Sequence, residues 1–240
     1  MTLSIALRGD TARFPGNTLP ALRSALRAGA DLVKVDVHLT SDGYPVLVDE
    51  RLVAPPGSPP RAVSGLTLTD LAAARDDVER RIPTLMEVLA EFGGHGPPPL
   101  LVSADTAQAA LAAHSLLDER GFGDRVLFTG SADTLGALRA HSPGARILMV
   151  WEEPGMPPDE IAHALGPEFL GHHHALLTRE LVSEMHRSGY LVTAWGVNDF
   201  PHMARLIGMG VDALATERIH DLVSLTSGRA RSGATAAHPA

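Results

Sequence analysis

Residues 99–150, PLLVSADTAQAALAAHSLLDERGFGDRVLFTGSADTLGALRAHSPGARILMV, repeat one pattern twice and begin it a third time. Short apolar runs at 99–104, 125–129 and 145–150 have the length and composition of buried strands. Longer amphipathic segments at 106–120, 131–141 and 158–165 follow them and are expected to be helices. Regular alternation of strands with helices indicates a parallel sheet covered by helices.

The same alternation extends to both sides of this segment. Further strands are expected at 3–7, 31–39, 168–171, 190–195 and 211–216, and further helices at 18–29, 67–74, 83–93, 178–188, 199–209 and 218–225. Only a short extended piece at 45–49 and a Pro/Gly-rich loop at 53–65 interrupt the pattern. The sequence therefore predicts an α/β fold, a single (β/α)8 TIM barrel over residues 1–225, with a disordered tail at 226–240.

Composition excludes several classes of function. The 240 residues carry a formal net charge of −8 without a basic block, so we expect no nucleic-acid partner. No apolar run reaches the roughly 18 residues that span a bilayer. A secretory leader is not visible in MTLSIALRGD, and we expect a cytoplasmic protein. With no cysteine there is neither a disulfide nor a thiolate zinc site.

The strand LVKVDVHLT, residues 32–40, carries three charged or titratable side chains at alternate positions. They are Lys34, the only lysine in the chain, Asp36 and His38. Because residues two apart on a strand share a face, Lys34 and Asp36 are expected to be neighbours that can form an ion pair. Function in a TIM barrel is concentrated at the carboxyl ends of the strands, where this strand places them.

Several motifs, in order along nearly the whole chain, resemble those of the glycerophosphodiester phosphodiesterase family. ALRGD resembles the family's AHRG, FPGNTLPAL its PENT motif, and VKVDVHLTSDGYPVLVDERL its ELDVHLTKDG segment. RIPTLMEVL, VTAWGVND and GVDALATER resemble three later motifs. The resemblance implies a barrel of the phosphatidylinositol-phosphodiesterase-like type and a place in glycerophosphodiester and lipid metabolism.

The same resemblance implies hydrolysis by two histidines, with a divalent cation, Mg²⁺ or Ca²⁺, held by three acidic ligands and with an arginine on the phosphate. Here Leu7 and Val48 stand at the two histidine positions. Since neither side chain can transfer a proton, both catalytic roles are empty and no catalytic residue is intact.

The metal ligands are also replaced. Lys34 and Ser103 stand at two of the three ligand positions, Gly16 replaces the PENT glutamate, and Asp36 is the one ligand retained. One carboxylate beside an ammonium binds a divalent cation poorly. We therefore expect no metal cofactor.

Some binding elements remain, and we assign substrate binding to Arg8, Asn17, Lys34, Asp36 and Trp195. Each has a plainer alternative. Arg8 can form a structural ion pair at the barrel mouth, Asn17 can serve as a turn or cap residue, and Trp195, which with Asn198 matches a family motif, can pack in the core. Acidic residues at other strand ends are more often solvated or paired with arginines; they are Asp105, Glu152 and Glu217.

Three functions remain open from the sequence. The first is a non-catalytic homologue that binds a small anionic molecule, such as a glycerophosphate, or an unknown protein partner. The second is an active phosphodiesterase with a relocated site that uses Asp36, Asp49, His38 or the triplet His172, His173 and His174. The third is Schiff-base chemistry at Lys34, which the neighbouring Asp36 disfavours because it stabilises the charged ammonium. We predict the first, an impaired pseudoenzyme.

Overall fold

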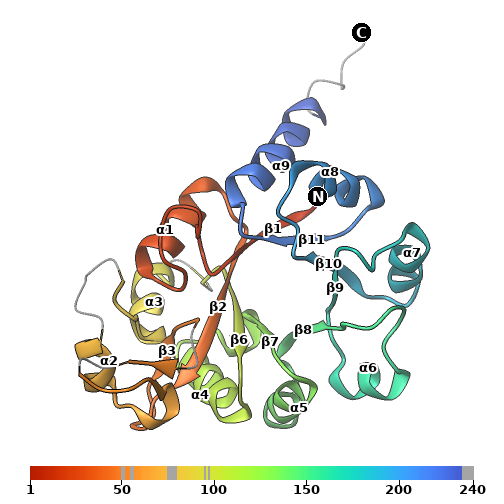
Figure 1. The fold of residues 1–240 in the computed structure, drawn as a ribbon. Coiled ribbons are helices and arrows are strands. Elements are labelled where there is room, and N and C mark those ends of the chain that lie inside the picture. The colour runs from red at the N-terminus through yellow and green to blue at the C-terminus, as the bar shows by residue number, and fades with distance from the viewer. Residues whose placement is uncertain (50–51, 55–56, 75–79, 95, 97, 234–240) are drawn as a thin grey trace.

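The computed structural model describes residues 1–49, 52–54, 57–74, 80–94, 96 and 98–233. Eight parallel strands close into a barrel (Figure 1) because β1 pairs with both β2 and β11. They are β1 (Leu3–Leu7), β2 (Leu32–Leu39), β6 (Leu100–Ala104), β7 (Leu127–Thr129), β8 (Arg146–Val150), β9 (Phe169–His173), β10 (Leu191–Trp195) and β11 (Ala213–Thr216). The predicted TIM barrel is confirmed.

Helices surround the barrel (Figure 1). They are α1 (Leu19–Ala28), α2 (Leu68–Ala74), α3 (Leu85–Phe92), α4 (Ala107–Asp118), α5 (Ala132–His141), α6 (Asp159–Leu165), α7 (Arg179–Arg187), α8 (Phe200–Met209) and α9 (Ile219–Gly233). In the described part of the chain, none of them is both long and apolar enough to cross a bilayer.

Side-chain caps fix where many of these helices begin. The first residue before the helix accepts a hydrogen bond from a backbone N–H in the first turn, which satisfies a group that the helix itself leaves unpaired. The capping residues are Thr18, Thr84, Thr106, Ser131, Thr178 and Asp199. Four of them, Thr106, Ser131, Thr178 and Asp199, follow a barrel strand by only a few residues, so strand and helix are joined by a short, defined connection.

Apolar side chains form two shells. The inner shell fills the barrel with Ile5, Leu101, Leu127, Leu148, Phe169, Ala213 and Ala215. The outer shell lies between strands and helices, and Val33, Val35 and Val37 of β2 belong to it. Because side chains alternate along a strand, the remaining residues of β2, Lys34, Asp36 and His38, lie on the opposite face. The alternation along β2 therefore places these three polar side chains at the opening of the barrel.

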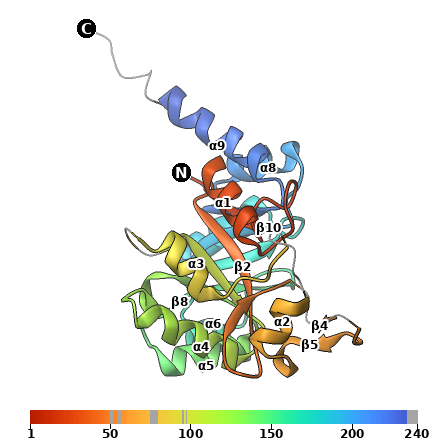
Figure 2. The ribbon, with the colours of Figure 1, turned by 90° about the vertical axis from the view of Figure 1, so that its left-hand side faces the viewer.

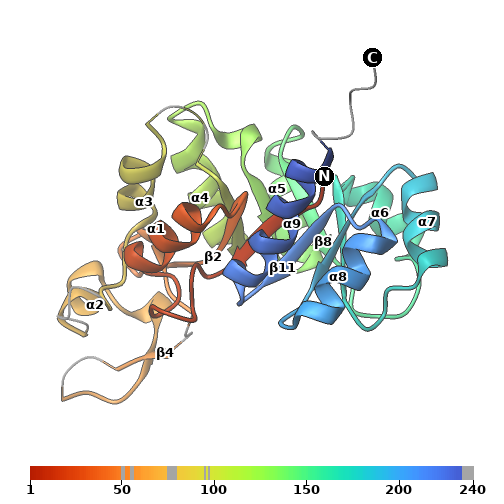
Figure 3. The same cartoon turned by 90° about the horizontal axis from the view of Figure 1, so that it is seen from above.

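A small subdomain projects from one side of the barrel, around α2 and β4 (Figures 2 and 3). It contains β3 (Pro45–Leu47), antiparallel to β2, and the hairpin of β4 (Leu52–Val53) and β5 (Arg61–Ala62). The 3-10 turn η1 (Val63–Gly65) follows, so part of the loop expected at 53–65 is ordered structure. A second such turn, η2 (Gly123–Arg125), precedes β7 and delays the start of that strand to Leu127.

The end of the chain differs from the expectation. Helix α9 continues to Gly233, eight residues beyond the predicted end at 225. The helix covers residues 226–233 of the tail, and the rest of the tail, 234–240, lies outside the described residues. Disorder of the tail stays a prediction.

Candidate functional site

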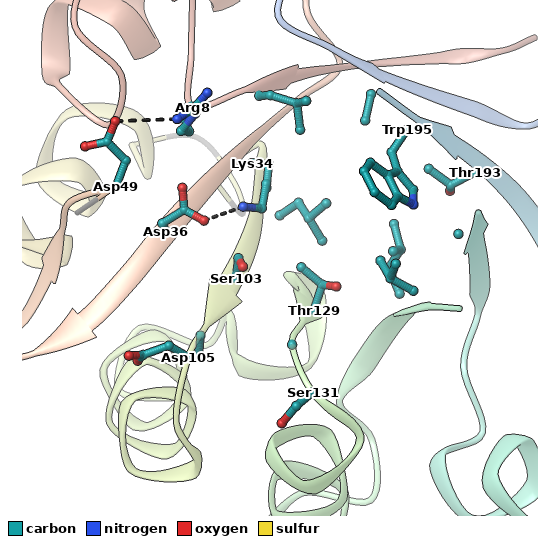
Figure 4. Close-up of a pocket in the computed structure, with 18 of the residues that line it drawn as sticks. Arg8, Lys34, Asp36, Asp49, Ser103, Asp105, Thr129, Ser131, Thr193 and Trp195 are labelled. Carbon is teal, nitrogen blue, oxygen red and sulfur yellow. Dashed lines mark hydrogen bonds and ion pairs between the residues drawn. The ribbon is translucent and has the colours of Figure 1, made fainter. Parts of the chain in front are cut away.

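A cavity of about 600 Å³ opens at the carboxyl end of the barrel. Arg8, Lys34 and Asp36 line one side of it, and Thr193 and Trp195 line the other (Figure 4). The walls also include apolar side chains of the inner shell, among them Leu101 and Leu148. Position, size and mixed lining are those of a small-molecule pocket in this fold.

Arg8 stands at the end of β1 in a backbone conformation that is rare for a side-chain-bearing residue, with φ of +61°. Its guanidinium donates to Glu217 Oε1 at 2.6 Å and lies 3.5 Å from Asp49 Oδ2. The following Gly9 has φ of +93°, and a Cβ there would lie 2.6 Å from the backbone carbon of Ala21. The Arg-Gly pair thus allows a sharp turn that directs the guanidinium into the pocket.

Lys34 and Asp36 form the ion pair that the strand pattern predicts. The Lys34 Nζ donates to Asp36 Oδ1 (Figure 4). The other carboxylate oxygen, Oδ2, accepts a hydrogen bond of 3.1 Å from the side chain of Asn17. Both oxygens of Asp36 are therefore engaged by protein donors.

Asn17, which we expected to bind substrate, is buried and does not line the pocket. Its side-chain oxygen accepts from the Asp36 N–H at 3.0 Å, and its own N–H donates to the Arg8 carbonyl at 2.9 Å. With φ of +57° it adopts the left-handed conformation that asparagine tolerates. Asn17 therefore holds Asp36 and Arg8 in position, and its role in substrate binding stays a prediction.

A second polar pair lies beside the first. The imidazole Nδ1 of His38 is 3.0 Å from Asp105 Oδ2, and both residues line the pocket. Glu152 lines it too, with no ion pair or hydrogen bond of its side chain among the described residues. The lining thus carries four carboxylates, Asp36, Asp49, Asp105 and Glu152, against the two cations Arg8 and Lys34.

The opposite wall offers unpaired neutral groups. The Thr193 hydroxyl and the Trp195 indole N–H are buried and have no hydrogen-bond partner within the described residues. Both residues line the pocket, but these two polar atoms are themselves buried, so a bound molecule reaches them only if the side chains turn. The Trp195 ring also meets the His173 ring edge-on, at 4.9 Å between centroids, which holds the indole in place.

Comparison with known proteins agrees with this architecture. The model of the glycerophosphoryl diester phosphodiesterase family matches residues 8–221. This chain belongs to that family. It is 26% identical to a glycerophosphodiester phosphodiesterase of Caldanaerobacter subterraneus over 239 residues, which cover 93% of this chain and 97% of that protein. It is 28% identical to a probable glycerophosphodiester phosphodiesterase 2 of Mycobacterium tuberculosis over 237 residues, covering 90% and 87%.

Solved structures share the fold at lower identity. A putative glycerophosphoryl diester phosphodiesterase of Silicibacter pomeroyi has a TM-score of 0.81 and 21% identity, covering 95% of this chain and 94% of that one. An Oleispira antarctica phosphodiesterase, solved with the product sn-glycerol-3-phosphate, has a TM-score of 0.77 and 22% identity, covering 95% and 97%. These similarities establish the barrel and leave the chemistry to the residues of this chain.

The two positions where the family places histidines are apolar and lie in different surroundings. Leu7 lines the pocket beside Lys34, its partner in the β1–β2 pairing. Val48 is buried in the apolar cluster of the subdomain, with Val46, Leu66 and Leu71, and only its neighbour Asp49 lines the pocket. Neither residue supplies a proton-transfer group.

The residues present do not fit the family's Mg²⁺ or Ca²⁺. Such ions need several oxygen ligands, yet the Asp36 oxygens are taken by Lys34 and Asn17, and Ser103 is the neighbouring residue on β6. Gly16 supplies no ligand, and a Cβ there would lie 3.0 Å from Arg8 Cβ, so a glutamate at this position would require Arg8 to shift. Within the described ranges, no three His, Asp or Glu side chains are arranged to hold a metal.

The histidine triplet does not converge on one point. His172 is fully buried, with both ring nitrogens unpaired in the described part of the chain, and burial lowers its pKa. The His173 ring packs on Trp195, and the His174 ring lies 5.0 Å from that of His202. The His173 and His174 rings also pack on each other, at 4.5 Å between centroids, while His172 is buried apart from them, so the three rings do not surround one ion.

Sequence reasoning did not assign Thr193 or the partner of Arg8. Thr193 shares a strand face with Trp195, so the period of two was the available signal. Glu217 was expected to be solvated or paired with an arginine more often than to form part of a rebuilt site, and it does pair with Arg8.

Proposed function

We propose that this member of the family has lost, or nearly lost, phosphodiester hydrolysis and that its barrel binds a small anionic molecule such as a glycerophosphate. The observation that carries the proposal is the Lys34–Asp36 ion pair at the pocket wall. It puts a fixed positive charge where the family resemblance places a metal ligand. The proposals of a cytoplasmic location and of a role in lipid metabolism follow from the family and composition.

Loss of hydrolysis follows from what the pocket lacks. Metal-assisted hydrolysis needs a cation to stabilise charge on phosphate and groups that transfer protons. Leu7 and Val48 transfer none, and Asp36 has no free oxygen for a metal. Binding of an anion depends instead on positively charged side chains, and Arg8 and Lys34 supply them.

Arg8 and Lys34 are the groups that would hold the anion. Both are only partly exposed, with 32% and 25% of their side chains accessible, so their charges act in a semi-enclosed site. Arg8 offers the fork that suits a phosphate or carboxylate. Because carboxylates already contact both cations, an anion competes with Asp36, Asp49 and Glu217, and we expect modest affinity.

A hydrolysis assay tests the first half of the proposal. We expect no turnover of glycerophosphocholine with Mg²⁺ or Ca²⁺ above the level of an Asp36→Ala control. Metal-dependent turnover that the control abolishes would overturn the pseudoenzyme proposal.

Calorimetry with sn-glycerol 3-phosphate tests the second half. We expect saturable binding that weakens in Lys34→Ala and weakens further in Lys34→Glu, since the latter reverses the charge. Binding that is absent from the native protein, or equal in all three forms, refutes the anionic pocket. Borohydride trapping with a carbonyl compound tests the lysine alternative, and the Lys34–Asp36 contact predicts no adduct because a protonated amine has no lone pair.

One observation favours a second function, catalysis from a relocated site. His38 is held by Asp105 at the pocket wall, and an imidazole oriented by a carboxylate is a common general base. If turnover is found, His38→Gln should remove it while Lys34→Ala retains it. Turnover that survives His38→Gln excludes this role.

A further inference from the structure

A second cavity, outside the barrel, lies in the groove between α1 and α9 and has a volume of about 500 Å³. Figures 1 and 2 show the two helices next to each other, and their residues are in contact. Its lining includes Arg13, Arg23, Arg27 and His220, together with Phe14 and Ser24. We call it the α1/α9 groove.

The arginines reach the groove from two elements. Arg23 and Arg27 are four residues apart on α1, so they lie on the same helix face. Arg13 comes from the loop between β1 and α1, and His220 from the first turn of α9. Four cationic or titratable side chains thus meet in one cavity of a chain whose net charge is −8.

Basic side chains predominate in the groove lining, whereas carboxylates outnumber cations in the lining of the barrel pocket. No carboxylate is part of the groove lining among the described residues. Two carboxylates outside the lining contact its residues. Glu91 binds Arg23 at 2.6 Å, and the fully buried Asp10 binds Ser24 at 2.7 Å and His220 at 2.9 Å, with Arg13 at 3.8 Å. In the barrel pocket both cations, Arg8 and Lys34, are paired with carboxylates.

The three arginines of the groove differ in the hydrogen bonds and ion pairs that they already form within the protein. Arg23 is held by Glu91 through two hydrogen bonds of 2.6 and 2.9 Å, which fixes its guanidinium. Arg27 has no side-chain hydrogen bond or ion pair within the described part of the molecule. Arg13 is 61% exposed and touches only the distant, shared Asp10. Two guanidinium groups are therefore available to a ligand beside a third that is fixed.

We propose that the α1/α9 groove binds the phosphate group of an organic phosphate, as a site separate from the barrel. Guanidinium forks match phosphate oxygens and give charge-assisted hydrogen bonds. Phe14 and Pro20 add an apolar wall for the organic part of the ligand. The same chemistry describes a soluble phosphate ester and the headgroup of an anionic phospholipid, and the experiment separates the two sources.

The test uses the full chain with two probes. Sn-glycerol 3-phosphate is titrated by calorimetry, and vesicles of phosphatidylcholine with and without phosphatidic acid are sedimented with the protein. The main variant is Arg13→Gln with Arg27→Gln, and the matched control is Arg120→Gln, an exposed arginine outside the groove. Arg8→Gln reports on the barrel, and melting temperatures check that each variant folds.

In the Arg8→Gln background, which weakens the barrel site, we expect the double variant to bind at least about tenfold more weakly, because two charge-assisted hydrogen bonds to the phosphate are lost. Arg120→Gln should bind as the native protein does, and groove binding should persist in Arg8→Gln. Loss confined to soluble glycerol phosphate identifies a phosphate ester, and loss confined to phosphatidic acid vesicles identifies a lipid headgroup. The proposal is overturned if neither probe binds Arg8→Gln, or if the binding that remains in Arg8→Gln survives the addition of Arg13→Gln and Arg27→Gln.

Discussion

Glu217 limits how strongly Arg8 can hold an anion. Its carboxylate accepts from the guanidinium at 2.6 Å, and a bound phosphate would need the same donors. We predict that Glu217→Gln tightens binding of sn-glycerol 3-phosphate about two- to fivefold, the scale expected for a partly exposed ion pair. Glu152→Gln is the matched control, because it removes a pocket carboxylate that does not contact Arg8. Equal gains in both variants would show that overall charge, not competition for Arg8, sets the affinity.

Asn17 combines two roles that mutations can separate. Its side chain bonds the N–H and the carboxylate of Asp36, and its backbone has φ of +57°. Asn17→Gly should destabilise the fold by about 1–3 kcal/mol through the lost buried hydrogen bonds. Asn17→Ala should cost about 1–2 kcal/mol more, because alanine also resists the left-handed conformation. Urea unfolding of both variants checks this, and equal losses would exclude backbone strain at this position.

Strand β9 carries a titratable group in its buried outer face. Burial lowers the pKa of His172 below its ordinary 6.5, so the unfolded chain takes up a proton more readily than the folded one. Stability from this group is present above pH 6.5 and is lost as the pH falls toward the lowered folded value. We predict that the free energy of unfolding of His172→Leu falls less steeply on acidification than that of the native protein, by up to about 1.4 kcal/mol per pH unit. Urea unfolding between pH 7 and 5 measures it.

The control for that experiment is His163→Leu, at an exposed position on α6. It should leave the pH dependence of the free energy of unfolding as it is in the native protein. His174 retains its own lowered pKa, caused by burial and by the nearby His173, His202 and Arg205, so some acid sensitivity remains in His172→Leu. An unchanged slope in His172→Leu would contradict the prediction.

At the scale of elements, the hydrophobic pattern predicted the eight strands and their helices. Barrel strands place apolar side chains in both the inner and the outer shell, and the surrounding helices place an apolar face against the strands. The Lys34–Asp36 contact was predictable for the same reason, as it depends on the period of one strand. The Arg8–Glu217 contact was not, since it joins residues 209 positions apart and exists only when β1 pairs with β11. The burial of Val48 depends on the subdomain packing, which a short apolar run does not reveal.

The C-terminal end of α9 is a helical segment that the sequence pattern did not predict. Residues 226–233 lack an apolar period, yet they continue a helix whose first turns are anchored by the buried Ile219 and Leu222. Helix propagation adds one hydrogen bond per residue once the first turn exists, so a polar segment can extend an anchored helix. An apolar period marks the residues of a helix that are expected to be buried. It therefore gave no sign of the part of α9 beyond residue 225.

At the scale of the whole molecule, the chain keeps the family's barrel, and the proposed loss of hydrolysis has two separate causes, one in the metal site and one in proton transfer. Leu7 and Val48 account for the proton transfer, and Lys34 and Ser103 account for the metal. The two losses should therefore be reversible one without the other.

Lys34→Glu tests this separation. The variant places a second carboxylate beside Asp36 and removes the ammonium that occupies Asp36 Oδ1. Without metal, we expect a lower melting temperature than for Lys34→Ala, because like charges repel on one strand face. Ca²⁺ should raise the melting temperature of Lys34→Glu at concentrations on the order of 1 mM, typical of a site with few ligands, and should not raise that of Lys34→Ala. Hydrolysis should stay absent, since a restored cation does not supply a proton donor. A Ca²⁺ response equal in both variants would place the ion elsewhere, and metal-dependent hydrolysis by Lys34→Glu would show that the histidine positions are dispensable in this barrel.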